Sequence, residues 1–147
     1  MNYSSSIPEV NLKNLIHNYK VFKKFIKNKQ VAATIKANAY GIGDKIAFST
    51  LYKNGCRHFF LATLNEGLEL RKSFKKGYIY ILNGLENNDI NIFKINKLIP
   101  ILNSKIEMKV IEKTKFKFGI HIDTGLNRLG INKKDLPKKI YNKKNLQ

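Results

Sequence analysis

Apolar and polar positions follow two alternating spacings along the chain. In PEVNLKNLIHNYKVFKKFI (8–26) apolar residues recur every three or four positions with lysines opposite them, which predicts an amphipathic helix that Asn11 can cap. The next run, QVAATIK (30–36), is compact and contains β-branched residues, so it predicts a buried strand.

The alternation of strand and helix continues along the chain. Residues 44–54 predict a helix, with Asp44 near its start and Gly55 just past its end. Short apolar runs predict further strands at 58–63, 78–82, 98–102 and 116–123, the third interrupted by Pro100. Helical spacing predicts helices at 64–74, 89–96 and 104–114. The polar tail NKKDLPKKIYNKKNLQ predicts no further strand.

Five strands separated by helical stretches of about ten residues are typical of an α/β protein with a parallel sheet. Two architectures fit this series: an open doubly wound sheet, and the opening part of a (β/α)₈ barrel, which takes about 250 residues. No G-x-G-x-x-G motif follows a predicted strand, and this argues against a dinucleotide-binding fold. With 147 residues, such a barrel is incomplete, with about five βα units.

Composition places the chain in a broad class. An apolar content of 43% indicates a globular domain, and no uncharged apolar run approaches the roughly 20 residues of a membrane span. The first residues lack the basic region and apolar core of a secretory signal. The single cysteine, Cys56, has no internal disulfide partner, which fits a reducing cytoplasm.

The formal net charge of +18 raises the question of nucleic-acid binding. Of the 28 basic residues, 25 are lysines spread among asparagines and isoleucines, whereas proteins that read a base sequence rely on arginine. This distribution indicates a solvated lysine coat more than a specific nucleic-acid patch. A basic binding module remains an alternative.

Lys36 ends a predicted buried strand at the point where a loop begins. In parallel βα folds, functional groups collect at the carboxyl ends of strands. A lysine that is partly desolvated there favours its neutral amine, which can form an imine with an aldehyde. The alternative is a lysine at the edge of the sheet whose aliphatic part packs on the protein while its ammonium stays in solvent.

The residues after Lys36 favour the chemical alternative. Ala37 and Ala39 are small enough for a flat ligand to approach, and Tyr40 offers a hydroxyl to a phosphate oxygen. Glycines at 41 and 43 permit a tight turn with exposed amides, a favourable place for an anion. An aldehyde that also carries a phosphate describes pyridoxal 5′-phosphate, and no metal is expected.

A second segment, HIDTGLNRLGI (121–131), follows the predicted fifth strand. Asp123 and Thr124 can fold the backbone into a turn through side-chain hydrogen bonds. Arg128 then lies in a constrained loop at the same edge of the sheet as Lys36, where a guanidinium can bind a phenolate oxygen and a carboxylate. Taken alone, the loop favours the alternative, a surface arginine.

Together these segments resemble the alanine racemase family, and specifically the N-terminal part of its fold-type III pyridoxal-phosphate barrel. IKANAYGIG and IDTGLNRLG match two family signatures, FFLATLNEGLELR (59–71) looks like the segment between them, and the resemblance spans residues 8–131. It implies that Lys36 is the Schiff-base lysine and one of two catalytic bases. Tyr40 is then the phosphate contact, and Arg128 the partner of the cofactor phenolate and the substrate carboxylate. The implied reaction interconverts L- and D-alanine, which supplies D-alanine for the cell wall.

Three positions depart from the family pattern. Ile42 stands where the family usually has histidine, and Leu126 replaces the usual methionine. His121 lies where several members carry a lysine that becomes carbamylated and orients the arginine. A histidine can support Arg128 through a water or by packing, but it does not supply the carbamate's negative charge.

The resemblance also implies parts that this sequence does not contain. In the family the opposing tyrosine base comes from a C-terminal β domain of the partner subunit, and most phosphate-binding groups come from later barrel strands. We therefore expect a truncated or split form that is inactive alone, completed by a complementary C-terminal chain or a homodimer. The alternatives are a non-catalytic remnant and a pyridoxal-phosphate homeostasis protein; the KANAYG motif favours the racemases. The expected organisation is a partial barrel domain over 1–132 and a lysine-rich tail over 133–147.

Overall fold

The structure, a computed structural model, describes residues 9–27, 29–85, 90–114 and 116–136. At its centre is a five-stranded sheet in the order β1-β2-β3-β4-β5, in which every neighbouring pair is parallel. The strands are β1 (Ala33–Thr34), β2 (His58–Leu61), β3 (Tyr78–Ile81), β4 (Leu98–Leu102) and β5 (Gly119–Ile120). Because neighbours in the sheet are also neighbours in the chain, the predicted βα series with a parallel sheet is confirmed.

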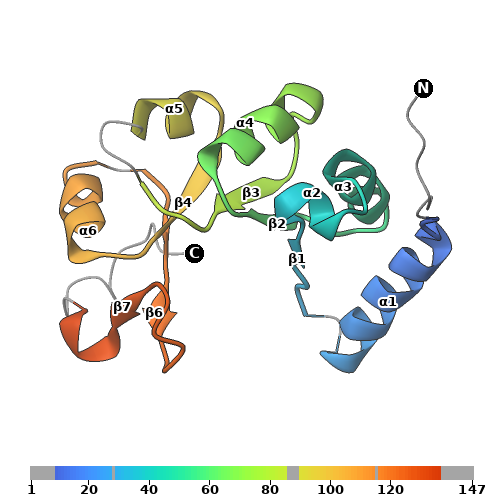
Figure 1. The fold of residues 1–147 in the computed structure, drawn as a ribbon, viewed down its shortest axis with the longest axis horizontal. Coiled ribbons are helices and arrows are strands. Elements are labelled where there is room, and N and C mark those ends of the chain that lie inside the picture. Colours follow the sequence, from blue (N-terminus) through green and yellow to red (C-terminus); the bar gives the residue numbers. More distant parts are fainter. Residues whose placement is uncertain (1–8, 28, 86–89, 115, 137–147) are drawn as a thin grey trace, which may run out of the picture.

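One helix precedes the sheet, and the others follow the strands in turn, with α3 to α6 on one face. The helices are α1 (Leu12–Phe25), α2 (Lys36–Tyr40), α3 (Asp44–Lys53), α4 (Leu64–Ser73), α5 (Ile90–Ile95) and α6 (Lys105–Glu112). Figure 1 shows a curved sheet with α3 to α6 along its outer side and α1 beyond the β1 edge. The predicted helices are confirmed to within a few residues, although residue 89 and the tail from 137 onward lie outside the described part.

Side-chain caps explain where three of these helices begin. The Asn11 side chain accepts hydrogen bonds from the amides of Lys13 and Asn14, as expected for the cap of α1. Thr63 and Glu66 form a reciprocal capping box at the start of α4. Ser104 caps α6, its hydroxyl accepting from the amide of Glu107.

The core lies between the sheet and its outer helices. Phe59, Leu61, Ile79 and Ile81 alternate along β2 and β3 and are fully buried on this face. The Phe48 ring of α3 packs against them, with ring centroids 4.2 Å from Phe59. This single packed layer fixes the positions of the loops at the carboxyl ends of the strands.

The opposite, inner face of the sheet carries the alternate residues of the same strands. On it His58 stacks on Tyr78 and Phe60 stacks on Tyr80, with ring centroids 4.9 and 4.7 Å apart. His58 and Phe60 are half-buried and Tyr78 is exposed, because no helix in the described part covers this face. The inner face is therefore an aromatic surface that is only partly covered.

The structure corrects four details of the predicted strands. The first strand is only Ala33–Thr34, so Lys36 lies beyond it. The predicted strand 116–123 is broken at His121 into β5 and β6 (Ile122–Asp123), and β6 pairs with a strand that the pattern did not predict, β7 (Ile131–Asn132). A 3₁₀ turn, η1 (Lys133–Asp135), follows β7.

The fourth detail is Pro100, which does not interrupt β4. Leu102 accepts a hydrogen bond from the His121 amide, so main-chain groups at even positions of β4 face β5. Pairing with β5 begins only at Ile101, so the missing N–H of Pro100 faces no ladder partner.

Among the described residues, no helix is both long enough and apolar enough to cross a lipid bilayer.

Candidate functional site

Lys36 lies at the start of a left-handed turn. Ile35 continues the sheet, its amide donating to the carbonyl of Phe60, and Lys36 is half-buried just after it. The next four residues, Ala37 to Tyr40, all have φ between 50° and 54°, the left-handed region. For L-residues this conformation costs roughly 1–2 kcal/mol per residue, so the turn requires support from its surroundings.

Two side chains hold this turn in place. The Glu66 carboxylate accepts from the Ala37 amide at 2.8 Å, and from the amides of Ala62 and Thr63 at 2.7 and 3.2 Å. Asn38, inside the turn, accepts from the Asp44 amide through Oδ1 at 3.0 Å. The turn is thus fixed to the amino end of α4 on one side and to that of α3 on the other.

The expectation that the glycine amides after Lys36 are available to an anion is wrong. The amides of Gly41 and Gly43 both donate to the Asn38 carbonyl, at 3.1 and 2.9 Å. The Ile42 amide donates to the Ala39 carbonyl. These three amides are therefore already bonded within the loop, and the described residues form no phosphate-binding site from them.

Tyr40 and Ile42 face different surroundings. Tyr40 is 66% exposed, so its hydroxyl is accessible from solvent. Ile42, at the position where a histidine was expected from the resemblance, is half-buried and packs against the core. The departure at Ile42 therefore exchanges a polar ring for an apolar contact that anchors the loop.

The loop after β6 is ordered by Asp123. Its carboxylate accepts from the amides of Gly125 and Asn127 at 3.0 and 3.1 Å. These hydrogen bonds, that from Gly125 foremost, hold the pKa of Asp123 below its usual value. The turn predicted at Asp123 is confirmed, and it presents Arg128 on an exposed segment.

His121 is bound to a neighbouring strand end. Its Nδ1 lies 3.0 Å from Oδ1 of Asn103, whose amide nitrogen donates to the carbonyls of Leu82 and Ile101. Because Oδ1 of Asn103 only accepts, Nδ1 of His121 carries the proton in this contact. The hydrogen bond described for the His121 ring thus leads to Asn103, and support of Arg128 through a water or by packing stays a prediction.

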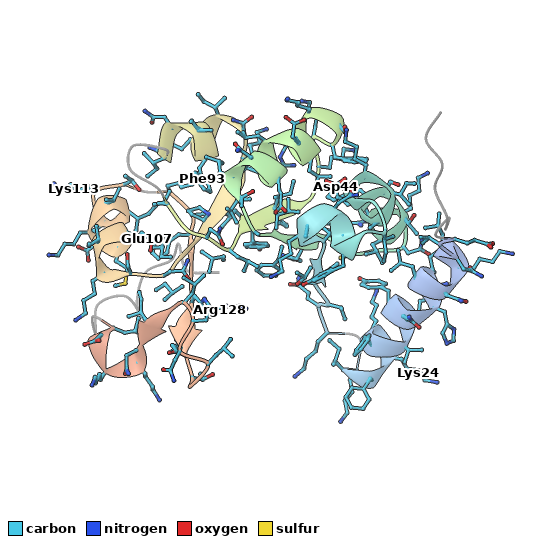
Figure 2. The ribbon with its side chains drawn as sticks, viewed as in Figure 1. Lys24, Asp44, Phe93, Glu107, Lys113 and Arg128 are labelled. Carbon is cyan, nitrogen blue, oxygen red and sulfur yellow. The ribbon has the colours of Figure 1, made fainter. Side chains whose placement is uncertain are left out.

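Lys36 and Arg128 follow the carboxyl ends of the two edge strands of the sheet. Since the strands are parallel, both residues lie at the same edge of the fold, as expected. Four strand spacings of about 4.8 Å separate β1 from β5, so the strands lie on the order of 19 Å apart along the sheet. Neither side chain makes a hydrogen bond or ion pair within the described part of the chain. Figure 2 shows Arg128 on the region of β6 and β7, at the far end of the arch from α2.

A hollow of about 550 Å³ lies elsewhere, on the inner face. Its lining includes His58 and Tyr78, the first residues of β2 and β3, so it extends from the amino ends of the strands. His58 Nδ1 is 2.8 Å from the Tyr80 hydroxyl, and burial lowers the pKa of His58. Lys36 and Arg128 do not line this hollow, so it is separate from the candidate site.

Sequence reasoning missed Glu66 and Asn103, the residues that fix the two loops. A signal for Glu66 was present, because Thr63-Leu64-Asn65-Glu66 has the spacing of a capping box. That spacing predicts the cap but not the hydrogen bond to Ala37, which is 29 positions away. Asn103 had no comparable signal.

The sequence matches a known protein family and curated relatives. Residues 10–147 match the family described as "Alanine racemase, N-terminal domain". The alanine racemase of Rhizobium meliloti is 37% identical over 87% of this chain and 35% of its own length. That of Rickettsia prowazekii is 34% identical over 87% of this chain and 33% of its own. The chain thus spans about a third of the length of the curated relatives it matches.

Solved structures show the same fold. The alanine racemase of Bartonella henselae, with covalently bound pyridoxal phosphate, superposes with a TM-score of 0.79 and 31% identity, over 90% of this chain and 41% of that one. A histidine racemase of Leuconostoc mesenteroides superposes with a TM-score of 0.77 and 25% identity, over 92% and 39% of the two chains. The chain therefore belongs to the family of alanine racemase N-terminal domains.

Proposed function

We propose that this chain carries the cofactor lysine of a pyridoxal-phosphate racemase that interconverts L- and D-alanine, and that this lysine is Lys36. The observation that carries the proposal is the supported left-handed turn, which holds a half-buried lysine at the carboxyl end of a parallel strand. The curated relatives named alanine racemase and the covalent pyridoxal phosphate of the Bartonella structure support the same assignment.

The residues present fit one end of this cofactor better than the other. Lys36 suits the aldehyde, whereas the amides of 41–43 are already bonded and leave Tyr40 as the phosphate contact that we propose. When bound, pyridoxal phosphate withdraws electrons from the amino acid and acidifies its Cα–H bond. The remaining phosphate contacts have to come from outside the described residues.

The chain's own residues then have distinct tasks. The Lys36 amine holds the cofactor and moves a proton to and from one face of the substrate Cα. The Arg128 guanidinium, exposed on the loop ordered by Asp123, binds the substrate carboxylate and the cofactor's phenolic oxygen. Proton transfer on the opposite face requires a second base.

We infer that the sheet is part of a (β/α)₈ barrel. Its curvature and the partly exposed aromatic inner face support this, because additional strands would cover that face and leave the outer helices in place. In a closed eight-stranded barrel β1 and β5 face each other across the mouth, so the direct distance between Lys36 and Arg128 is shorter than the path along the sheet. These further strands, with the second base, belong to a complementary chain or to a longer form of this one, and the assembled enzyme is a dimer.

We further propose that the 147 residues alone do not racemise alanine. The observation that favours this is that Lys36 and Arg128 follow the two outermost strands, β1 and β5, and that neither side chain has a partner among the described residues. The histidine racemase among the structural neighbours indicates that this fold serves more than one amino acid. We propose alanine as the substrate because the curated relatives are named alanine racemase.

The buried free thiol of Cys56 fits a reducing compartment such as the cytoplasm.

The test uses the purified chain and a limiting amount of pyridoxal phosphate. Borohydride reduction followed by peptide mass spectrometry should place the adduct mainly on Lys36, and Lys36→Ala should abolish the absorbance of the lysine-linked cofactor. Lys45→Ala removes an exposed lysine of the neighbouring helix and should change neither result. Adducts spread evenly over the many surface lysines would contradict the assignment.

A further inference from the structure

We propose that Glu66 is a positioning residue for Lys36: its carboxylate sets the direction in which the lysine leaves the backbone. Glu66 is the third residue of α4, far from Lys36 in the sequence, yet Oε1 accepts from the amide that directly follows Lys36, at 2.8 Å. This inference rests on the proposed role of Lys36 as the cofactor lysine.

The geometry of the peptide unit makes this contact specific for Lys36. The Lys36–Ala37 peptide is planar, so a hydrogen bond that fixes its N–H also fixes the plane attached to the Lys36 Cα. On the other side of Lys36, the Ile35–Lys36 peptide is held through the Ile35 carbonyl, which accepts from the Ala39 amide at 2.9 Å. With both flanking peptide planes fixed, the Cα–Cβ bond of Lys36 has one direction.

The contact also lies where the backbone φ angle changes from negative to positive values. Ile35 has a φ of −125°, and Ala37 has a φ of 50°. The Ala37 amide is at this junction, and a carboxylate is a stronger acceptor for it than a neutral oxygen. Oε2 of Glu66 meanwhile accepts from Ala62 and Thr63, which ties the junction to the end of β2.

The simpler explanation is that Glu66 serves only as a helix cap. Glu107 provides the matched comparison, since it is the third residue of α6, and its carboxylate accepts from the amides of Leu85 and Asn103. Its contacts resemble those of Glu66 in number and length, but they lead to the loop after β3 and not to Lys36. A purely structural role predicts equal consequences for the two residues.

Glu66→Gln separates the two explanations. Glutamine keeps one accepting oxygen and replaces the other with an NH₂ group, so it cannot accept from both Ala37 and the Ala62–Thr63 pair. In the apo chain, hydrogen exchange of the Ala37 amide should be faster by about tenfold in Glu66→Gln, the effect of losing one charge-assisted hydrogen bond. Glu107→Gln should leave the Ala37 exchange rate unchanged while it lowers global stability.

The second readout is reductive trapping at Lys36 with pyridoxal phosphate. The adduct should require about tenfold more cofactor in Glu66→Gln than in Glu107→Gln, with spectra that show both variants folded. Equal Ala37 exchange and equal trapping in the two variants would overturn the positioning role. If the unmodified chain gives no Lys36 adduct, the proposed function fails, and the exchange of Ala37 still decides whether Glu66 holds the turn.

Discussion

Glu66 and Glu107 occupy equivalent places in two βα units. Each is the third residue of the helix that follows its strand, and each accepts from the amide just after that strand, Ala62 at 2.7 Å and Asn103 at 2.8 Å. Each also reaches the loop that follows the preceding strand, at Ala37 and Leu85. In both units, therefore, a glutamate carboxylate joins the loop after its own strand to the loop after the preceding strand.

The space around Glu107 gives the first prediction. Gly84 has a φ of +82°, and a Cβ there would overlap the Glu107 carboxylate oxygen. We expect Gly84→Ala to lower the free energy of unfolding by about 2–5 kcal/mol, the sum of left-handed strain and the lost bond to the Leu85 amide. Urea unfolding measures this difference.

Gly41→Ala is the control for Gly84→Ala. Gly41 has a similar φ of +90°, but nothing lies within 4 Å of its added Cβ. Gly41→Ala should therefore lower the free energy of unfolding only by the backbone strain, about 1–2 kcal/mol. Equal losses in the two variants would show that the Glu107 contact contributes little.

Arg71 gives the second prediction, which concerns the fold alone. This side chain is 5% exposed and donates to four carbonyls, those of Phe74, Lys76, Gly77 and Lys97. We expect Arg71→Lys to lower the free energy of unfolding by about 3 kcal/mol, because an ammonium cannot reproduce the planar fork of donors.

Arg57→Lys is the matched comparison for Arg71→Lys. Arg57 donates to two carbonyls, and its guanidinium carbon lies over the Tyr52 ring of α3, 4.3 Å from the ring centroid. Arg57→Lys should lower the free energy of unfolding by about 1 kcal/mol or less, because the Arg57 guanidinium is closer to solvent than that of Arg71. A larger loss at Arg57 than at Arg71 would contradict the importance that we assign to the buried carbonyl cluster.

The loop that carries Arg128 gives the third prediction. A Cβ on Gly130 would lie 2.9 Å from the Asp123 amide nitrogen and 3.1 Å from the His121 carbonyl oxygen, at a φ of +106°. Because both neighbours are backbone atoms, Gly130→Ala has to distort the β6–β7 pair. We expect a loss of about 2–4 kcal/mol in unfolding free energy or local melting of this loop seen by hydrogen exchange.

Gly125→Ala, in the same loop, separates steric overlap from backbone strain. Gly125 has a φ of +124° with nothing within 4 Å of an added Cβ. Its variant should retain exchange protection of the Ile131 amide, which donates to the His121 carbonyl at 2.8 Å. Loss of that protection in Gly125→Ala but not in Gly130→Ala would refute the prediction.

His58 gives the fourth prediction, a pH dependence. Burial lowers the pKa of His58 from its usual 6.5, so between the two values the unfolded chain binds more protons than the folded chain. The stability that depends on neutral His58 is therefore present above about pH 6.5, and it is lost as the pH falls through the folded-state pKa.

A series of urea unfolding curves between pH 7 and pH 5 measures this dependence. The unmodified chain should lose stability across this range, and His58→Phe, which preserves a ring against Tyr78, should lose less. An unchanged slope in His58→Phe would assign the pH dependence to other groups.

Much of the fold could be predicted from the sequence because its elements are specified locally. Apolar spacing and caps such as Asn11 depend on residues within a few positions of each other, so helix and strand order followed from the pattern. The candidate residues Lys36, Tyr40 and Arg128 were also evident, since their motifs are contiguous. Their roles stay predictions.

The contacts that shape the site join distant parts of the chain. The break at His121 coincides with its bond to Asn103, and no local pattern in 116–123 predicts such a partner. The glycines at 41 and 43 predicted a turn, yet whether their amides stay free depended on how Asn38 was oriented within it.

By itself the sequence determined the alternation of strands and helices, the parallel sheet and the positions of the lysine and arginine loops, because these follow from local periodicity and turn chemistry. Only the tertiary structure decided that the backbone after Lys36 is left-handed. That conformation is unfavourable on its own, and it persists because two side chains accept the hydrogen bonds that hold it: Glu66, from another helix, and Asn38, which binds the Asp44 amide at the start of α3.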